Sequence, residues 1–272
     1  MPTSRAPRWR PSPLLVASAG VHGGAAAAIL AQLQLWPWAL GAVAANHALL
    51  AAAGLWPRSR LLGPNWTHLP TPAGAAPARI ALTLDDGPDP EVTPRVLELL
   101  ERHGARATFF CIGERVAAHP ALARQIAAAG HALENHSQRH LASFSLLGPH
   151  RLRAEIERAQ EVIAASTGTR PQFFRAPAGL RNPFLDPVLQ RLGLTLASWT
   201  RRGFDTRERR PQRVLGALTR ALSAGDILLL HDGHAARSAS GEPVVLEVLP
   251  RLLGALRAAG LTPVTLRDAL SP

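Results

Sequence analysis

Apolar and polar residues alternate differently in three parts of the 272-residue chain. Residues 1–57 are dominated by a long uncharged stretch, and residues 58–78 are rich in Pro, Gly and Thr without a periodic apolar pattern. From residue 79 to residue 272, short apolar runs alternate with amphipathic stretches. This alternation predicts an α/β domain built on a parallel sheet or barrel, preceded by a linker and an apolar N-terminal segment.

The strand-like runs occupy residues 80–84, 107–112, 131–135, 172–175, 194–199, 226–230 and 262–266. Seven such runs separated by helical patterns predict about seven parallel strands. In parallel α/β folds the functional residues gather at the carboxyl ends of the strands, where the connecting loops lie. Polar residues that directly follow these runs are therefore the first candidates for a functional site.

The N-terminal segment contains 44 consecutive residues, 14–57, without a charged side chain. That length is about twice the ~20 residues that cross a bilayer as a helix. Gln32 and the residues from Trp36 to Trp38 lie near its middle, and Trp9 and Trp56 flank its ends as interfacial aromatic residues do. The pattern favours a hairpin of two membrane spans. A single span, an uncleaved signal sequence and a helical pair lying on the surface are the alternatives, because Ala, Gly and a few polar residues interrupt the segment.

Arginines near the two ends of this segment predict its orientation. Arg5, Arg8 and Arg10 precede the first span, and Arg58 and Arg60 follow the second. Because positive residues are retained on the cytoplasmic side, we expect a cytoplasmic N-terminus at the inner cell membrane. Two spans would return the chain to the same side, so the C-terminal domain is expected to face the cytoplasm.

Charge and cysteine content limit the classes of partner and of covalent cross-link that are expected. The net charge is +11, and all 30 basic residues are Arg. A nucleic-acid surface would interleave basic and aromatic residues on one element. The only dense basic run, residues 201–213, is more typical of a solvated loop and helix start, so we expect no nucleic-acid partner. The single Cys111 excludes an intramolecular disulfide, and its apolar surroundings predict a buried, unreactive thiol.

Two adjacent carboxylates, Asp85 and Asp86, end the first strand-like run and precede a Gly-Pro turn. Neighbouring carboxylates repel each other, so such a pair binds a cation or holds its members at different pKa values. A solvated Asp-Asp turn is the alternative. His136 and His140 follow the third run four residues apart, on one face if the stretch is helical. Together with one of the aspartates they could provide three metal ligands.

Two further polar clusters end apolar runs, at residues 175–179 and at residues 231–233. In order and spacing, the four clusters resemble the NodB-like polysaccharide deacetylases of carbohydrate esterase family 4, over Arg79 to Leu270. The resemblance implies a distorted (β/α) barrel with fewer than eight regular strands. It also implies a hydrolase that acts on carbon-nitrogen bonds of amino sugars with one divalent metal ion.

The resemblance assigns roles to individual residues. Asp86, His136 and His140 would bind the metal, for which zinc is expected, with cobalt or another transition metal as alternatives. Asp85 would be the general base, and Arg175 would orient it.

On the substrate side, the resemblance makes His231 the general acid that protonates the leaving amine. Leu229 would line the pocket for the acetyl methyl group. Pro177 and Ala178 belong to the substrate-binding cluster, in which Ala178 would offer a backbone N–H to the oxyanion.

The fourth cluster departs from the family pattern, which has an Asp, two further residues and then Asp-Trp. This chain keeps Asp205 but has Arg202 and Thr206 at the other two positions. The partner of Arg175 is therefore left open. Trp199 or Phe204 could replace the aromatic wall of the substrate groove, and core packing is the alternative for both.

We therefore expect a membrane-tethered, metal-dependent hydrolase that removes acetyl groups from an N-acetylated amino-sugar polymer or lipid-linked glycan. One alternative keeps this machinery as a deacylase or deformylase of a lipid-linked sugar or other non-peptide amide. The other alternative is a catalytically silent protein that binds glycans or organises a membrane complex. An intact set of acid, base and metal ligands argues against the silent alternative.

Overall fold

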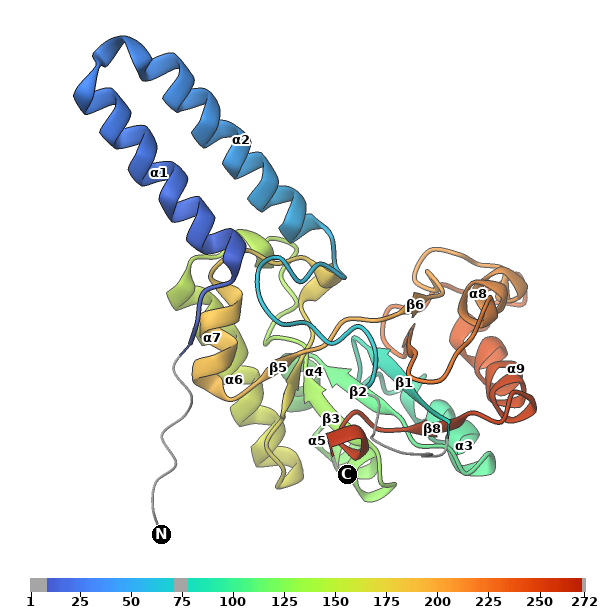
Figure 1. Cartoon of the computed structure of the whole chain (residues 1–272). Coiled ribbons are helices and arrows are strands. Elements are labelled where there is room, and N and C mark those ends of the chain that lie inside the picture. Colours follow the sequence, from blue (N-terminus) through green and yellow to red (C-terminus); the bar gives the residue numbers. More distant parts are fainter. Residues whose placement is uncertain (1–8, 71–77, 271–272) are drawn as a thin grey trace.

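The computed structural model describes residues 9–70 and 78–270. Two antiparallel helices, α1 (Pro13–Ala31) and α2 (Trp36–Leu55), project from a curved sheet wrapped by helices (Figure 1). A 3-10 helix, η1 (Leu33–Leu35), joins them at the far tip. The sequence-based prediction of a helical hairpin with a central turn is therefore confirmed in shape.

Eight strands form one sheet, and the pairings between them in the described residues are all parallel. They are β1 (Arg79–Asp85), β2 (Thr108–Cys111), β3 (Ala132–Asn135), β4 (Phe173–Phe174), β5 (Thr195–Leu196), β6 (Arg201–Arg202), β7 (Ile227–His231) and β8 (Thr262–Val264). The order is β5-β4-β3-β2-β1-β7-β6, and β8 pairs with the first half of β1. Each of the seven predicted runs overlaps a strand, and the predicted distorted parallel barrel is confirmed, with eight strands in place of about seven. Only β6 was not expected, because its two arginines carry no apolar signal.

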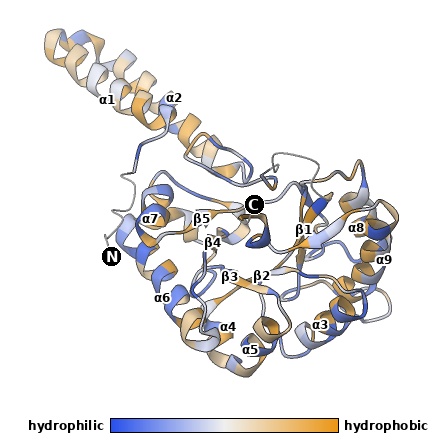
Figure 2. Cartoon of the chain, turned by 60° about the horizontal axis from the view of Figure 1, so that its bottom comes forward, coloured by the Kyte–Doolittle hydropathy of each residue, from blue (hydrophilic) through white to orange (hydrophobic). Residues whose placement is uncertain are grey.

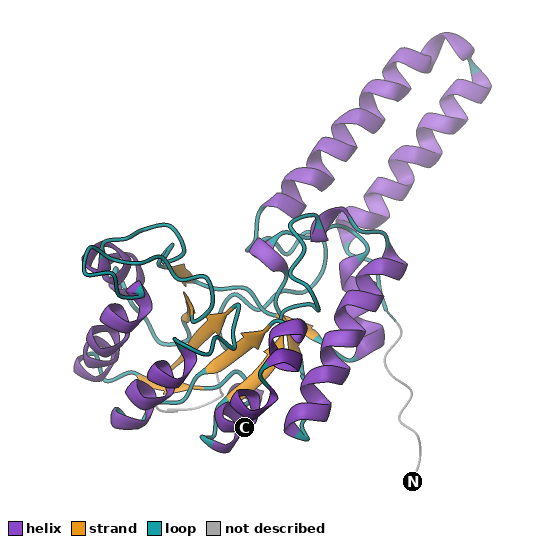
Figure 3. Ribbon diagram, turned by 180° about the vertical axis from the view of Figure 1, so that it is seen from behind, coloured by secondary structure: helices purple, strands orange, loops and turns teal. Residues whose placement is uncertain are grey.

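Helices cover the outside of the sheet, as the view from behind shows (Figure 3). They are α3 (Thr93–Arg102), α4 (Gly113–Ala118), α5 (Pro120–Ala128), α6 (Pro149–Thr167), α7 (Leu185–Leu192), α8 (Pro211–Thr219) and α9 (Val244–Ala258). Short 3-10 helices occur at η2 (Phe144–Leu146), η3 (Pro177–Gly179) and η4 (Asp268–Leu270).

Alternate side chains of β1 serve two different environments, because successive residues of a strand point to opposite faces. Ile80, Leu82 and Leu84 are fully buried in the core between the sheet and its outer helices. Thr83 and Asp85 point to the inside of the barrel, where both contact the same guanidinium. The last inward residue of the strand, Asp85, is thus polar and lies at the carboxyl edge of the sheet.

The segment around Trp66 lies between the two ends of the sheet. The Trp66 N–H donates to the carbonyl of Leu196 at 2.9 Å, and its own carbonyl accepts from the N–H of Ser198 at 2.8 Å. Three residues on, the N–H of Leu69 donates to the carbonyl of Gly225 at 2.8 Å. These bonds link the β5 side of the barrel to the start of β7.

Residues 58–78 were predicted to be a linker, and the structure describes them as far as residue 70. This part is packed rather than free: Leu62 is buried, and the Asn65 amide donates to the carbonyls of Pro57 and Ser59 at 2.9 and 3.1 Å. Residues 71–77 lie outside the described residues. The sequence missed the packing because isolated apolar residues in a Pro-rich stretch have no periodicity to reveal them.

The base of the hairpin is attached to the barrel by specific contacts. The carbonyl of Gly54 accepts from the N–H of Arg181 at 3.1 Å, and a Cβ at Gly54 would collide with the Arg181 carbonyl. The Arg181 guanidinium in turn donates to the Ser59 carbonyl. The Pro57 carbonyl accepts from the Ser198 hydroxyl at 2.7 Å.

Both hairpin helices are long and apolar enough to cross a membrane. Figure 2 shows apolar residues around both of them, whereas the helices that cover the barrel are polar on their outer side. Leu30, Leu33 and Trp38 are exposed to between 73 and 87% near the tip, far from the barrel. Apolar side chains so exposed indicate a surface that packs against lipid or another protein.

We expect Gly54→Ala to weaken the attachment of the hairpin. The new methyl group must displace the Arg181 carbonyl, and overpacking of this kind costs about 1–3 kcal/mol. Thermal unfolding in detergent and the rate of proteolysis within residues 55–70 measure the effect. Gly41→Ala in the same helix is the matched control, because its methyl group meets no atom within 4 Å. Equal stability and equal proteolysis of the two variants would contradict the attachment.

Candidate active site

One pocket of about 210 Å³ lies at the carboxyl ends of the strands. It brings together most of the residues that the sequence singled out. Its lining consists of Asp85, Asp86, His136, His140, Ala178, Gly179, Trp199, Arg202, Thr206, Leu229, His231 and His234. Arg175 and Asp205 lie directly behind this lining, and Pro177 is buried beside it.

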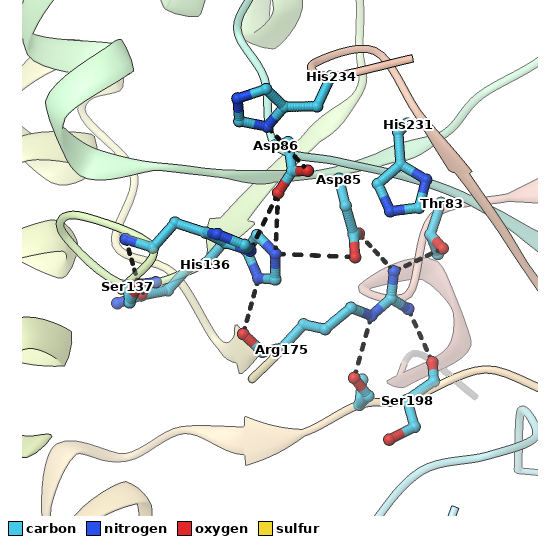
Figure 4. A network of polar contacts seen from close by, with 12 residues as sticks. Thr83, Asp85, Asp86, His136, Ser137, Arg175, Ser198, His231 and His234 are labelled. Carbon is cyan, nitrogen blue, oxygen red and sulfur yellow. Dashed lines mark hydrogen bonds and ion pairs between the residues drawn. The ribbon is translucent and has the colours of Figure 1, made fainter. Parts of the chain in front are cut away.

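The carboxylate of Asp85 is held by a guanidinium from inside the barrel (Figure 4). Arg175 is 1% exposed and donates to Asp85 Oδ1 at 2.6 Å and to the Thr83 hydroxyl at 2.8 Å. Its other nitrogens donate to the carbonyls of Ala197 and Ser198 at 3.2 and 2.7 Å. Burial lowers the pKa of Arg175, but the charge of Asp85 opposes the shift. The partner of Arg175, which the sequence left open, is therefore Asp85, the residue expected to be the base.

Asp86 and two histidines form a cluster that fits a metal ion. Asp86 Oδ1 lies 3.3 Å from the Nε2 atoms of both His136 and His140, and the three ligand atoms lie within 4.8 Å of one another. Ligands at about 2.1 Å from a tetrahedral zinc would be separated by about 3.4 Å. Asp86 Oδ1 is also buried without a hydrogen-bond partner among the described residues. Two imidazoles, a carboxylate and this unpaired oxygen fit a divalent transition metal.

The loop that carries the histidines prepares His136 for binding. Its Nδ1 lies 2.8 Å from the carbonyl of Arg175, which can only accept, so Nδ1 holds the ring proton and Nε2 is free for a metal. From the sequence, both rings were expected on one face if the stretch from His136 to His140 were helical. The stretch is a loop instead. Ser137 and His140 adopt positive φ angles of 66 and 51°, and the Ser137 hydroxyl accepts from the His140 N–H. This turn still brings the ring centres to 4.8 Å.

The neighbouring histidines and Asp86 shift one another's pKa values. Burial acts to raise the pKa of Asp86, but its contacts with His136 and His234 hold the pKa far below its usual range. Burial acts to lower the pKa of His136, and the charges of Asp85 and Asp86 reverse this and raise it. The pKa of His140 is lowered by burial and by the nearby His136. Asp86 is therefore ionised, as a metal-binding carboxylate must be, and the raised pKa of His136 lets protons compete with a metal ion for its Nε2.

His231 is the second titratable group aimed at the pocket, and Asp205 holds it. Asp205 is completely buried, and its two oxygens accept from His231 Nδ1 at 2.8 Å and from the His231 backbone N–H at 2.7 Å. Burial lowers the pKa of His231, but Asp205 outweighs it, and the pKa rises to about 9. The ring is thus protonated at neutral pH, which is the form that a general acid requires.

Three predicted substrate-binding residues line the same pocket, namely Leu229, Trp199 and Ala178. Leu229 and Trp199 are 1% and 7% exposed, so each belongs to the interior core as well as to the pocket wall. Ala178 has a φ of 55°, a strained conformation for a residue with a side chain. Pro177 is buried and is not part of the lining, so it shapes the turn before Ala178 rather than the wall.

Sequence reasoning missed His234. Its Nδ1 lies 3.2 Å from Asp86 Oδ2, and its Nε2 lies 2.9 Å from the guanidinium of Arg115. Because a guanidinium only donates, Nε2 is the acceptor and Nδ1 carries the proton toward Asp86. His234 thus orients the carboxylate of the metal cluster. The only sequence signal was a second histidine three residues after His231.

Comparison with known proteins supports this geometry. The sequence profile described as polysaccharide deacetylase matches residues 73–197, a range that contains the first three clusters and ends before Asp205 and His231. A peptidoglycan-N-acetylglucosamine deacetylase of Bacillus cereus is 33% identical over 193 residues, which covers 70% of this chain and 87% of that protein. A chitooligosaccharide deacetylase of a Bradyrhizobium species is 35% identical over 156 residues, covering 57% of this chain and 71% of that protein.

The solved structure of a family 4 carbohydrate esterase from Streptomyces lividans, in complex with acetate, has the same fold. The TM-score is 0.62 at 33% identity, covering 68% of this chain and 91% of the esterase. The chain belongs to the polysaccharide deacetylase family, the NodB-like proteins of carbohydrate esterase family 4.

Proposed function

We propose that this chain is a metal-dependent hydrolase that removes acetyl groups from an N-acetylated amino sugar, in a glycan or a lipid-linked glycan. The observation that carries the proposal is one small pocket with a carboxylate, Asp85, and a protonated imidazole, His231, beside a three-residue metal cluster. The named activities of the bacterial relatives support the substrate class. A protein that only binds glycans has no need of an acid and a base beside metal ligands.

Asp86, His136 and His140 would hold the metal ion, with zinc as the first candidate and cobalt or another transition metal as alternatives. When bound, the metal polarises the acetyl carbonyl and lowers the pKa of water at the site. His234 and the Arg175 carbonyl hold ligands Asp86 and His136 in the required orientation.

The residues of this chain would divide the proton transfers between them. Asp85, fixed by Arg175, accepts a proton from water as the water oxygen bonds to the acetyl carbon. The carbon-nitrogen bond then breaks, and the nitrogen takes a proton from His231, which Asp205 keeps oriented and charged. One water is consumed, and acetate and a free amine leave.

The wall of the pocket suits a small acyl group. Leu229 and Trp199 are apolar, nearly buried and adjacent to the metal cluster, so they are suited to the acetyl methyl group. The backbone N–H of Ala178 is the candidate donor to the oxyanion that develops on the acetyl oxygen.

Metal binding is tested with His136→Ala and His140→Ala. Each removes one of three ligands, so we expect metal content after dialysis to fall well below one ion per chain while the fold persists. Elemental analysis and circular dichroism measure the two properties. His150→Ala, on the exposed surface of α6, is the control that keeps full metal content. Full occupancy in both ligand variants would rule out the proposed cluster.

Activity is tested by the release of acetate from N-acetylglucosamine oligomers by the full-length protein in detergent, with and without added metal. The Asp85→Asn variant keeps the shape of the side chain but cannot accept a proton, so we expect a loss of about 10²–10⁴ in rate. Its metal content should stay normal, because Asp85 is not a proposed ligand. An Asp85→Asn variant as active as the wild type would refute the assigned base.

We also propose that the hairpin spans the inner cell membrane twice and that the barrel faces the cytoplasm. The Ser12 hydroxyl donates to the Leu61 carbonyl at 2.7 Å, so the start of α1 and the end of α2 lie together at the barrel. Two spans would then place Arg10, Arg58 and Arg60 on the same side of the membrane, in agreement with the charge rule.

Reporters fused to the C-terminus test this orientation. A fluorescent protein that matures only in the cytoplasm should be bright, and a phosphatase that is active only in the periplasm should be silent. Deleting residues 33–55 should reverse both signals, because the single remaining span keeps Arg5, Arg8 and Arg10 on its cytoplasmic side. A strong phosphatase signal from the full-length fusion would overturn the proposed orientation.

A further inference from the structure

One cation in the pocket has no role in the mechanism above. Arg202 is the only arginine among the described residues that line the pocket. Its Nε is buried without a hydrogen-bond partner, and no carboxylate forms an ion pair with it in the described part of the chain. The guanidinium carbon lies 5.4 Å from the ring centre of Trp199 and 5.0 Å from that of Phe204. Two aromatic rings thus hold a charged group that lacks a counter-ion.

Two arginines near Arg202 have acceptors for their guanidinium groups. Arg201, the preceding residue, donates from Nε to Asp226 at 2.6 Å, and Arg175 has four acceptors. A buried donor without an acceptor carries an uncompensated desolvation cost. Packing on two rings does not explain the cost, because a Met side chain would fill the same space without it.

The charge also stands where the family pattern has an Asp. In this chain Arg175 bonds to Asp85, and Asp205 bonds to His231, so neither depends on a carboxylate at position 202. The substitution therefore leaves the acid and the base in place. What it changes is the charge that the substrate meets at the pocket wall.

We propose that Arg202 binds an anionic group, a phosphate or a carboxylate, that the amino sugar carries close to its N-acetyl group. The inference rests on the proposed function and narrows its substrate class. The Nε–H and one terminal N–H of a guanidinium form a fork that matches two oxygens of an oxyanion. The rings of Trp199 and Phe204 lie close to this guanidinium and stabilise its charge in place.

The position of the pocket favours the phosphate of a lipid-linked sugar as the source of the anion. Pro57, at the base of the hairpin, packs against Gly179 in the pocket lining, where an added Cβ would lie 2.7 Å from Pro57 Cβ. Ser198 and Thr200, on either side of Trp199, bond to Pro57 and Arg58 at 2.7 and 3.1 Å. The pocket wall is thus continuous with the base of the hairpin, and a sugar attached to a membrane lipid would reach it.

The test compares kcat/KM for three substrates: N-acetylglucosamine, N-acetylglucosamine 1-phosphate, and the same phosphate esterified to a ten-carbon prenyl chain in detergent micelles. We expect the wild type to prefer the phosphorylated sugars, and the prenyl ester most of all. Arg202→Met should reduce the phosphorylated-to-neutral ratio by about 10- to 100-fold, the value of a charge-assisted hydrogen bond. The ratio for Arg202→Lys should fall between those of the wild type and Arg202→Met, since Lys keeps the charge but loses the forked pair of donors.

Arg207→Met is the matched control, because it removes the same charge from an exposed position in the turn that follows β6. It should leave the ratio unchanged. Equal kcat/KM for neutral and phosphorylated sugars in the wild type, or equal effects of the substitutions at positions 202 and 207, would overturn the proposal. A free sugar phosphate preferred over the prenyl ester would keep the anion site and reject the lipid as its source.

Binding separates this inference from the proposed function. Calorimetry with the Asp85→Asn protein measures the affinity for N-acetylglucosamine 1-phosphate without turnover. Addition of Arg202→Met should weaken that affinity at least about tenfold, while the melting temperature reports the integrity of the fold. If no substrate releases acetate but this difference remains, the hydrolase proposal fails and the anion site stands. If acetate is released and the difference is absent, the anion site fails alone.

Discussion

The buried guanidinium of Arg175 is the constraint on which the rest of the structure depends. A charge that is 1% exposed inside a barrel must find partners, because leaving a buried charge unpaired costs about 3–5 kcal/mol. Its partners come from β1 and from the segment after β5, and its own carbonyl accepts from His136. One residue therefore joins the wall of the barrel to Asp85, the proposed base, and to His136, a proposed metal ligand. The site is an extension of the polar core and not an addition to the surface.

This network explains how two adjacent carboxylates acquire different roles. Asp85 is the last inward residue of β1, so it meets Arg175 inside the barrel. Asp86 follows with a φ of 72°, which turns its carboxylate toward the histidines at the rim. A positive φ is costly for an Asp, and strain of this kind persists only where the surroundings hold it. The close approach of Gly233 to the Asp86 carbonyl, which leaves no room for a Cβ, is part of those surroundings.

The sequence predicted the parts of the structure that have a local signal. Apolar runs located seven strands, and because the ends of parallel strands meet at one edge, the polar residues that follow them could be grouped into one site. Contacts that no periodic sequence pattern signals could not be predicted. The two arginines of β6 show no strand pattern, Trp66 is a single apolar residue in a Pro-rich segment, and the loop around Ser137 depends on one hydroxyl. His234 escaped for the same reason, since only the fold brings it to Asp86.

The arrangement of charge around the pocket links recognition to chemistry. Asp85 and Asp86 place negative charge on the side where a divalent cation would sit, and Arg202 places positive charge on the wall beside Trp199. A neutral sugar gains nothing from that second charge, whereas a sugar with an oxyanion would be held at two points, its acetyl group at the cluster and its anion at the wall. Two fixed points restrict rotation of the substrate, and such orientation lowers the barrier to reaction. Since the same wall is bonded to Pro57 and Arg58, the hairpin that would anchor the chain also supports the surface that would select its substrate.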